Sequence, residues 1–161
     1  MIYNQENITG FRKPDAVAAP WYENMGDIPK HLEYSNGTMY EKLAEVAKEF
    51  PTNIAFDFMG KHTTYKQLLD KISACARSLR TIGVSRDDKI TIAMPNCPQA
   101  IYMLYAVNRV GAVANMIHPL SAEKEIEEYI NMSNSTTIVT LDQFYHKVEN
   151  IRENTEIRNV I

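Results

Sequence analysis

The stretch that decides the fold is MPNCPQAIYMLYAVNRVGAV, residues 94–113. The short runs on either side of it are apolar or β-branched, as in strands that are covered on both faces of a parallel sheet. Pro95 breaks the first run, Asn96 is a favourable N-cap, and Pro98 fits the first helical turn, where its missing N–H costs nothing. Apolar residues then recur at helical spacing until Gly111, which suits a helix C-terminus. The stretch therefore predicts a strand, a helix and a second parallel strand.

Two capping boxes predict helix starts earlier in the chain. Thr38 and Thr64 each precede, by three residues, a Glu or Gln that can bond back to the backbone, namely Glu41 and Gln67. The helix after Thr64 carries one continuous apolar stripe. The helix after Thr38 is expected to pack through the apolar residues at helical spacing, which are Met39, Leu43, Val46, Ala47 and Phe50.

Strand and helix patterns alternate through the rest of the chain. The predicted elements are a hairpin at 54–63, strands at 90–94, 112–117, 137–140 and from 159, and helices at 64–82, 98–110, 121–132 and 141–154. We expect the helix at 121–132 to use Ile126, Tyr129, Ile130 and Met132 for packing. This alternation predicts an α/β fold with a doubly wound parallel sheet. Residues 1–37 show no clean period and are predicted to form an extended arm, followed by an α/β subdomain at 38–161.

Composition excludes several classes of protein. A net charge of −3 without a basic stripe argues against a nucleic-acid partner. No secretory signal and no apolar run near the roughly 20 residues of a membrane span are present. Cys75 and Cys97 lie far apart and are expected to be reduced thiols in a cytoplasm, with Cys75 packed in the core. Two points stay open: a homodimer, and peripheral association with a membrane.

Cys97 and His118 are the two single residues that are candidates for a functional role. A thiol in the first turn of a helix can have a lowered pKa, but no base accompanies Cys97 in the sequence, so packing is the favoured interpretation over a reactive nucleophile. The four histidines have no partner at metal-ligand spacing, so no zinc site is expected; they are His31, His62, His118 and His146. His118 lies at the carboxyl end of a predicted strand, where such sheets bind ligands.

No phosphate-binding fingerprint is visible. The glycines are too far apart for a dinucleotide motif or a P-loop. Residues 133–137, SNSTT, have the hydroxyls of a phosphate cradle but lack its glycines and lead into a strand, so they are interpreted as a loop. The residues alone therefore assign no catalytic, cofactor-binding or metal-binding side chain.

Three stretches together resemble the adenylate-forming enzymes. Residues 64–68, TYKQL, are similar to the first core motif of that superfamily, with Gln67 where Glu is common. Residues 94–126 resemble its second conserved stretch: Gly111 and Ala112 match, whereas His118 stands where Asn is usual. Residues 20–43 are similar to the segment that leads into long-chain fatty-acyl-CoA ligases (acyl-CoA synthetases). The likeness covers nearly the whole chain in order and spacing.

The resemblance implies a two-step ligase. ATP and a carboxylate, such as a fatty acid, give an acyl-adenylate and pyrophosphate with Mg²⁺ assisting, and coenzyme A then takes the acyl group as a thioester. In that family the phosphate-binding loop, the adenine and magnesium contacts and the catalytic Lys follow the region that corresponds to residues 1–161. We therefore expect an N-terminal piece that is inactive by itself and binds neither ATP, Mg²⁺ nor coenzyme A, and we carry over no site residue.

Other interpretations stay open from the sequence. An aryl-acid or amino-acid adenylating enzyme would share the fold, because the acid pocket lies downstream. A stand-alone, non-catalytic interaction module is an alternative from another class. A nucleotide-binding oxidoreductase domain is disfavoured, because the glycine fingerprint after the first strand is missing.

Overall fold

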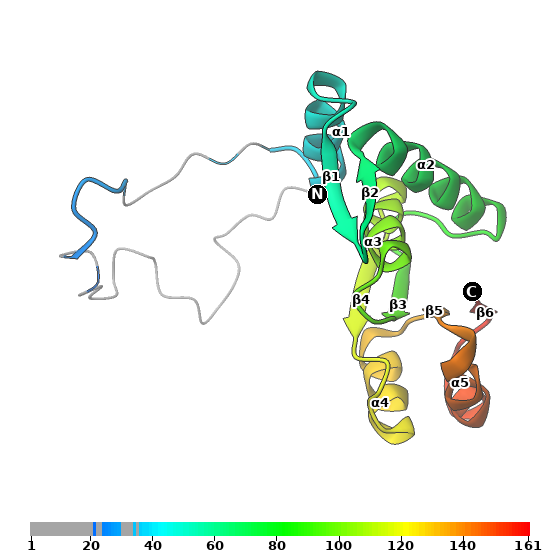
Figure 1. Ribbon diagram of the computed structural model, residues 1–161. Coiled ribbons are helices and arrows are strands. Elements are labelled where there is room, and N and C mark those ends of the chain that lie inside the picture. The colour runs from blue at the N-terminus through cyan, green and yellow to red at the C-terminus, as the bar shows by residue number, and fades with distance from the viewer. Residues whose placement is uncertain (1–20, 22–23, 30–33, 35) are drawn as a thin grey trace. The chain divides into compact units, whose positions relative to one another are not determined.

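The computed structural model describes residues 21, 24–29, 34 and 36–161. The chain divides into two units, Met1–Asn36 and Gly37–Ile161. The arm predicted at residues 1–37 lies for the most part outside the described residues. The second unit contains every helix and strand discussed below, and its elements are labelled in Figure 1.

A parallel sheet of four strands forms the centre of the second unit. Its strands lie in the order β4-β3-β5-β6, and all three neighbouring pairs are parallel. The strands are β3 (Lys89–Ala93), β4 (Val113–Ile117), β5 (Thr137–Thr140) and β6 (Asn159–Val160). Ile92 of β3 is paired with Met116 on one side and Val139 on the other. The α/β fold with a parallel sheet, predicted from the sequence, is confirmed.

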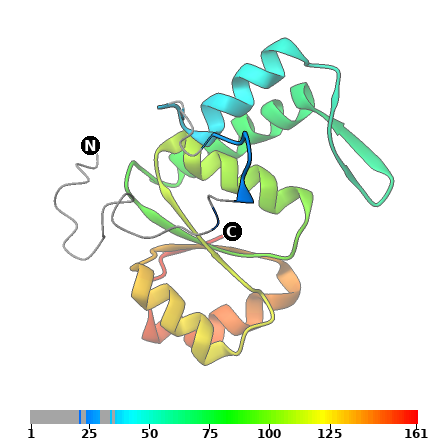
Figure 2. The same ribbon diagram turned by 90° about the vertical axis from the view of Figure 1, so that its left-hand side faces the viewer.

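Helices cover both faces of this sheet, as Figure 2 shows. The helices are α2 (Tyr65–Thr81), α3 (Pro98–Val110), α4 (Glu123–Ser133) and α5 (Tyr145–Ile151). Short 3₁₀ turns flank α5 at Asp142–Phe144 and Arg152–Asn154. One core lies between the sheet and α2 and α3, and includes Ile72, Leu79, Ile90, Ile92 and Val107. A smaller core lies between the sheet and α4 and α5, and includes Ile126, Ile130, Ile138 and Ile151. The two cores explain why the strands are apolar on both sides.

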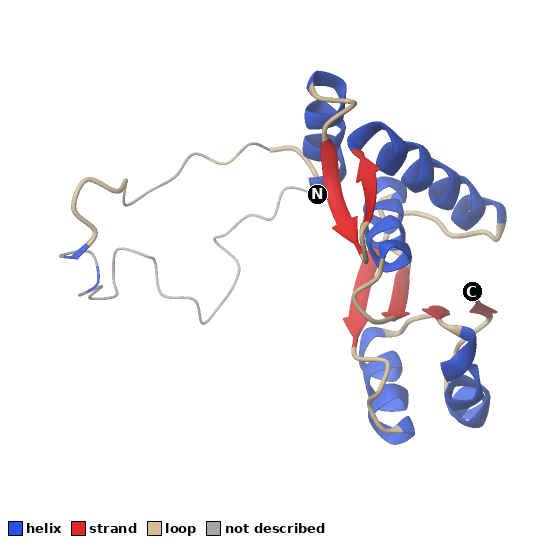
Figure 3. Ribbon diagram, viewed as in Figure 1, coloured by secondary structure: helices blue, strands red, loops and turns tan. Residues whose placement is uncertain are grey.

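A helix and a hairpin precede the sheet in the chain. They are α1 (Met39–Glu49) and the antiparallel pair β1 (Ile54–Phe58) and β2 (Lys61–Thr64), drawn as blue and red ribbon in Figure 3. The hairpin turns at Met59 and Gly60, whose φ angles are 53° and 79°. A positive φ is cheap only for glycine, so Gly60 suits the turn that the sequence predicted.

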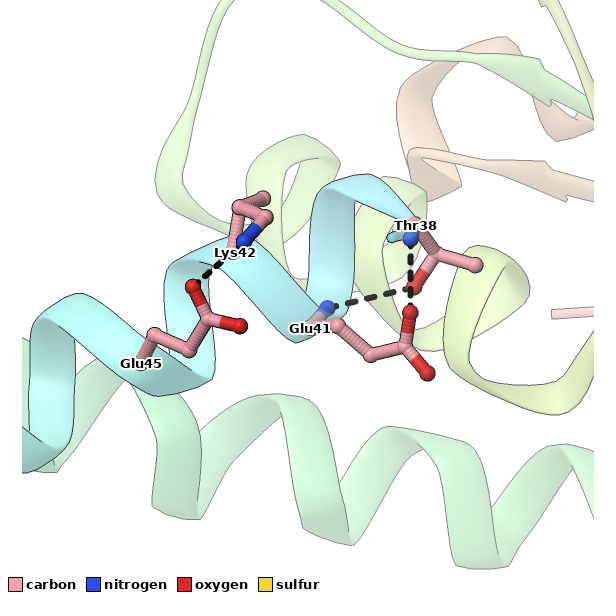
Figure 4. A network of polar contacts seen from close by, with 4 residues as sticks. All are labelled: Thr38, Glu41, Lys42 and Glu45. Atoms are coloured by element: carbon pink, nitrogen blue, oxygen red, sulfur yellow. Dashed lines mark hydrogen bonds and ion pairs between the residues drawn. The ribbon is translucent and has the colours of Figure 1, made fainter. Parts of the chain in front are cut away.

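Both predicted capping boxes are present. At α1 the Glu41 N–H donates to Thr38 Oγ1 at 3.2 Å, and the Thr38 N–H donates to Glu41 Oε2 at 2.7 Å (Figure 4). The same reciprocal pair joins Thr64 and Gln67 at α2, at 2.9 and 3.3 Å. Each box satisfies two backbone donors that a helix N-terminus otherwise leaves unpaired.

The predicted packing residues of two helices are partly wrong. In α1, Met39, Val46 and Phe50 are exposed, and only Ala47 is buried. In α4, Met132 is 81% exposed and Tyr129 is also exposed, while the other two predicted positions are buried. Helical spacing identifies which side chains share a face, but another element must cover that face before it becomes core.

The predicted N-cap of α3 is also wrong by one residue. The N-cap is Cys97, in extended conformation at φ −140°, and its side chain makes no capping bond. Pro98 is the first helical residue, and a proline holds the residue before it in the extended region, so the helix starts one residue later than Asn96 would set it. The C-terminus is as predicted: Gly111 has φ 87°.

Candidate functional site

The carboxyl edge of the sheet is the first place to look for a site. In a parallel sheet the segments that follow the strands meet at this edge, and open α/β sheets bind ligands there. The segments are residues 94–97 after β3, residues 118–122 after β4 and residues 141–144 after β5. They contain Cys97 and His118, the two residues that the sequence singled out.

The loop after β4 is held by bonds within the chain. His118 Nδ1 accepts a hydrogen bond from the Leu120 N–H at 3.2 Å, which places the ring proton of the neutral form on Nε2. From α5, Lys147 Nζ donates to the Ser121 carbonyl at 2.7 Å and to the Pro119 carbonyl at 3.5 Å. The Lys147 ammonium is thus used to fix the loop. The sequence analysis did not single out Lys147, because nothing in its local pattern links it to a loop 26 residues away.

Cys97 lies in an apolar setting. It is half-buried against the core of the α2 and α3 face and lines a pocket of about 340 Å³. The side chains that line this pocket with it are mainly apolar and include Phe56, Phe58, Ile101, Leu104 and Met116. No histidine is among the described residues that line it, so the base that a nucleophilic thiol needs is not at hand. The packing role favoured from the sequence agrees with this environment.

Cys75 is part of the same core. It packs against the buried residues of the α2 and α3 face, as predicted. Burial raises the pKa of the Cys75 thiol, which disfavours the reactive thiolate.

The segment 133–137, predicted as a loop, is one only at residues 134–136, because Ser133 ends α4 and Thr137 begins β5. The hydroxyls of Ser133 and Ser135 bond to neighbouring side chains. Thr91 Oγ1 donates to Ser135 Oγ at 2.8 Å, and Asn115 Nδ2 donates to Thr91 Oγ1 at 3.0 Å and to Ser133 Oγ at 3.1 Å. The Ser133 and Ser135 hydroxyls lie 2.8 Å apart. Thr91 and Ser135 are fully buried. The hydroxyls that could have cradled a phosphate therefore join β3, β4 and α4 to one another.

Of the other histidines, the structure describes His62 and His146, and neither belongs to a group that could hold a metal ion. His62 Nδ1 lies 3.0 Å from Asp57 Oδ2 on the exposed hairpin, His146 is exposed on α5, and His31 lies outside the described residues. Within residues 36–161 and the few described before them, no three His, Cys, Asp or Glu side chains are grouped so that they could hold a metal ion. None of the helices that the structure describes has the length and apolar character to cross a membrane.

A large pocket among the described residues lies at the opposite edge of the sheet. It has a volume of about 810 Å³ and lies where α2 and α3 end, near the start of β4. Its charged lining residues are Glu41, Arg80, Arg86 and Arg109. Sequence reasoning missed it, because the three arginines come from separate segments and only the fold brings them together.

Comparison with known proteins identifies the family. The model of the AMP-binding enzyme family matches residues 43–161. A long-chain-fatty-acid–CoA ligase of Bacillus subtilis is 32% identical over 129 residues, which cover 80% of this chain and 23% of that protein. The chain thus spans about a quarter of the length of the curated relatives it matches.

Solved structures share the fold. The crystal structure of a long-chain-fatty-acid-CoA ligase from Archaeoglobus fulgidus superposes with a TM-score of 0.75 at 21% identity, over 81% of this chain and 28% of that one. An anthranilate CoA ligase in complex with anthranoyl-AMP superposes with a TM-score of 0.71 at 17% identity, over 78% of this chain and 25% of that one. The sheet, its two helical layers and the match over residues 43–161 lead to one conclusion: the chain belongs to the AMP-binding family of adenylate-forming enzymes and corresponds to an N-terminal part of such an enzyme.

Proposed function

We propose that residues 1–161 form the N-terminal part of a long-chain fatty-acid–CoA ligase. The whole enzyme would join a fatty acid to ATP, release pyrophosphate, and transfer the acyl group from the adenylate to coenzyme A. The observation that carries this proposal is the sequence match to the Bacillus subtilis ligase over 80% of the chain. The likeness of residues 20–43 to the lead-in segment of fatty-acyl-CoA ligases supports the same substrate class.

Polar side chains near the carboxyl edge that could meet a phosphate are engaged within the chain. Lys147, which could have met a phosphate, donates to two carbonyls of the 118–122 loop. The hydroxyls of Ser133 and Ser135 bond to each other and to neighbouring strands. We therefore propose that the residues that hold ATP, Mg²⁺ and coenzyme A belong to other parts of the enzyme, and that residues 1–161 contribute part of the scaffold and have no ligase activity alone.

The test uses acid-dependent exchange of labelled pyrophosphate into ATP. The full product of the gene would be assayed with saturated fatty acids of increasing length, aryl acids and amino acids, with an acid-free reaction as the control. Exchange that is fastest with long-chain acids is expected. Exchange with none of the acids would overturn the proposal. Residues 1–161 alone, tested in the same assay, are expected to give no exchange above the control.

An aryl-acid ligase is the second candidate. Enzymes of this substrate class share the fold, as the anthranilate CoA ligase shows. In the same exchange assay, a preference for benzoate-type acids over long-chain fatty acids would select this candidate.

We also propose a cytoplasmic location. Cys75 and Cys97 are both free thiols, which suits a reducing compartment. Labelling of intact and lysed cells with a membrane-impermeant maleimide tests this: reaction only after lysis is expected, and reaction in intact cells would contradict it.

A further inference from the structure

The pocket at the amino edge of the sheet is built from three separate elements. Thr38, Tyr40 and Glu41 come from the start of α1, Arg80 from the last turn of α2, and residues 84–86 from the loop that follows. Residues 108–111, at the end of α3, complete the wall. At about 810 Å³ the pocket is within the range of small-molecule sites. It lies away from the carboxyl edge, where the sequence pattern led us to look.

The walls of this pocket are fixed by contacts across elements. The Tyr40 N–H donates to Asn108 Oδ1 at 2.9 Å and ties α1 to α3. The Arg109 guanidinium lies over the Tyr40 ring, 4.9 Å from its centroid, and also donates to Ser73 on α2. Arg86 packs over Gly111, where a Cβ would approach Arg86 Nε to 3.3 Å. Arg86 and Arg109 are thus positioned by contacts with other elements, which lowers the entropy cost of using them on a ligand.

The charge of the pocket is strongly unbalanced. Its lining has three arginines and one carboxylate, Glu41, in a chain whose net charge is −3. Arg80 and Arg86 form no ion pair with any residue that the structure describes. The Glu41 carboxylate is used on the Thr38 N–H (Figure 4), and the nearby Asp88 carboxylate is used on the N–H and hydroxyl of Ser85. The lining nevertheless keeps an excess of positive charge, because it holds three arginines against one carboxylate.

The pocket also lies beside the C-terminal ends of α2 and α3. Cations are common at helix C-termini because the last carbonyls are unpaired and carry negative partial charge. Here amides after α2 return to those carbonyls: the Gly83 N–H donates to Arg80 O at 3.0 Å and the Val84 N–H to Leu79 O at 3.0 Å. After α3, the Gly111 N–H donates to Asn108 O at 3.1 Å. Part of the helix-end carbonyls are thus paired with backbone amides and do not depend on the arginine side chains for a donor.

We infer that this pocket binds a compact anion with two or three linked phosphate groups. Arginine presents a planar fork of donors that matches phosphate oxygens. A pocket of about 810 Å³ lined by three arginines has room for more than one phosphate group. The one aromatic ring in the wall, Tyr40, is already covered by Arg109, so no open ring is offered for stacking a base. The inference does not rest on the proposed ligase function. It adds an arginine-based site to a chain in which the sequence, lacking a glycine-rich loop, led us to expect none.

Isothermal titration calorimetry of residues 1–161 with pyrophosphate, tripolyphosphate and monophosphate, in EDTA and at low salt, tests the inference. Pyrophosphate and tripolyphosphate are expected to bind, and monophosphate to bind about tenfold more weakly or not at all. Amide shifts in NMR spectra should concentrate at residues 84–86 and 108–111. Absence of pyrophosphate binding, or equal binding of monophosphate, would overturn the inference. Titration with ATP distinguishes two kinds of ligand that carry linked phosphates. If ATP binds as tightly as tripolyphosphate, the pocket accepts the phosphate tail of a nucleotide. If ATP binds more weakly than tripolyphosphate, the ligand is a free oligophosphate.

Three substitutions make the test specific. Arg86→Gln is expected to weaken pyrophosphate binding about tenfold, because one charged hydrogen-bonding fork is lost. Arg77→Gln, on the same helix as Arg80 but outside the lining, is the matched control and should change binding less than about twofold. Glu41→Gln should tighten binding about two- to fivefold by removing the pocket's negative charge. Gln67 makes the same capping bond at α2, so Glu41→Gln keeps the fold. Equal losses in Arg86→Gln and Arg77→Gln would contradict the site.

Discussion

On the α2 and α3 face of the sheet the buried side chains are apolar, whereas the α4 and α5 face also contains a buried network of hydroxyl and amide groups. The same strands contribute to both faces, since successive side chains of a strand point to opposite faces of the sheet. Ile90 and Ile92 lie in the first core, and Thr91 lies in the polar network. The core of the first face is held by close packing of apolar side chains. The second face depends in addition on donors and acceptors that must all find partners.

This difference predicts how each face responds to mutation. A packed apolar core loses stability in proportion to the volume removed. A buried polar network loses stability when one member is removed and its partners are left unsatisfied. Four substitutions, from the largest expected effect to the smallest, test the comparison.

Leu79→Ala should cause the largest loss. Leu79 is fully buried in the core of the α2 and α3 face, so truncation leaves a cavity and should lower the free energy of unfolding by about 2–5 kcal/mol. Urea unfolding followed by circular dichroism measures this loss. Ile82→Ala is the control, because Ile82 follows the same helix but is 42% exposed, and it should cost less than about 1 kcal/mol. Equal losses would show that the described core does not stabilise the fold.

Thr91→Val tests the polar network on the other face. The substitution keeps the shape of the side chain but removes the hydroxyl that joins Ser135 and Asn115, and should cost about 1–3 kcal/mol. The same substitution in a Ser135→Ala background should cost less, because one of the groups left unpaired is then absent. A double-mutant cycle by urea unfolding gives the coupling free energy, expected at about 0.5 kcal/mol or more. Strictly additive losses would contradict the network.

Thr64→Ala tests the local signal at the start of α2. Loss of the capping hydroxyl should lower the free energy of unfolding by about 1 kcal/mol. Thr64→Ser keeps the hydroxyl and is the control.

The start of α4 lacks a capping side chain at its N-cap. Ala122 has no side-chain acceptor, and only the Glu125 carboxylate bonds back, at 3.1 Å from the Ala122 N–H. Ala122→Ser should therefore stabilise the protein slightly, and a loss of stability in that variant would contradict the assigned N-cap.

Glu127 gives the smallest effect, seen only as a pH dependence. A hydrogen bond from Lys124 Nζ, at 2.5 Å, and a second from Asn154 Nδ2, at 3.2 Å, lower the pKa of the Glu127 carboxyl below its ordinary value of 4.5. A carboxyl whose pKa is lower in the folded protein stabilises it above pH 4.5, and the contribution is lost as the pH falls through the folded pKa.

Urea unfolding between neutral and acidic pH measures this effect. Glu127→Gln should unfold with a shallower loss of stability below pH 4.5 than the unaltered chain. Glu128→Gln is the neighbouring control, since the Glu128 carboxylate accepts no hydrogen bond from the residues described. Parallel pH profiles for Glu127→Gln and the unaltered chain would contradict the assigned pKa direction.

Most of the fold could be predicted from local patterns. The capping boxes at Thr38 and Thr64, the turn at Gly60 and the helix end at Gly111 each depend on a few neighbouring residues, and all are present. The N-cap of α3 shifted by one residue because Pro98 constrains the residue before it, an effect stronger than the preference of Asn96 for capping.

Burial was harder to predict than secondary structure. Met39 and Met132 lie at the helical spacing expected of core residues, yet they are 53% and 81% exposed. Their periodicity is genuine, but no described element covers those positions. The candidate sites show the same limit: the spacing of Arg80, Arg86 and Arg109 in the sequence gives no sign that they line one pocket.

The sequence by itself determined the order of helices and strands, several of their ends and the family resemblance, because these depend on side-chain periods, caps and motifs that are local in the chain. Only the tertiary structure decided which apolar faces are covered, that the hydroxyls of Ser133 and Ser135 point inward, and that three distant arginines meet at the amino edge of the sheet. The physical reason is that burial and charge balance depend on neighbours far away in the sequence, which only the packing of helices against the sheet brings together.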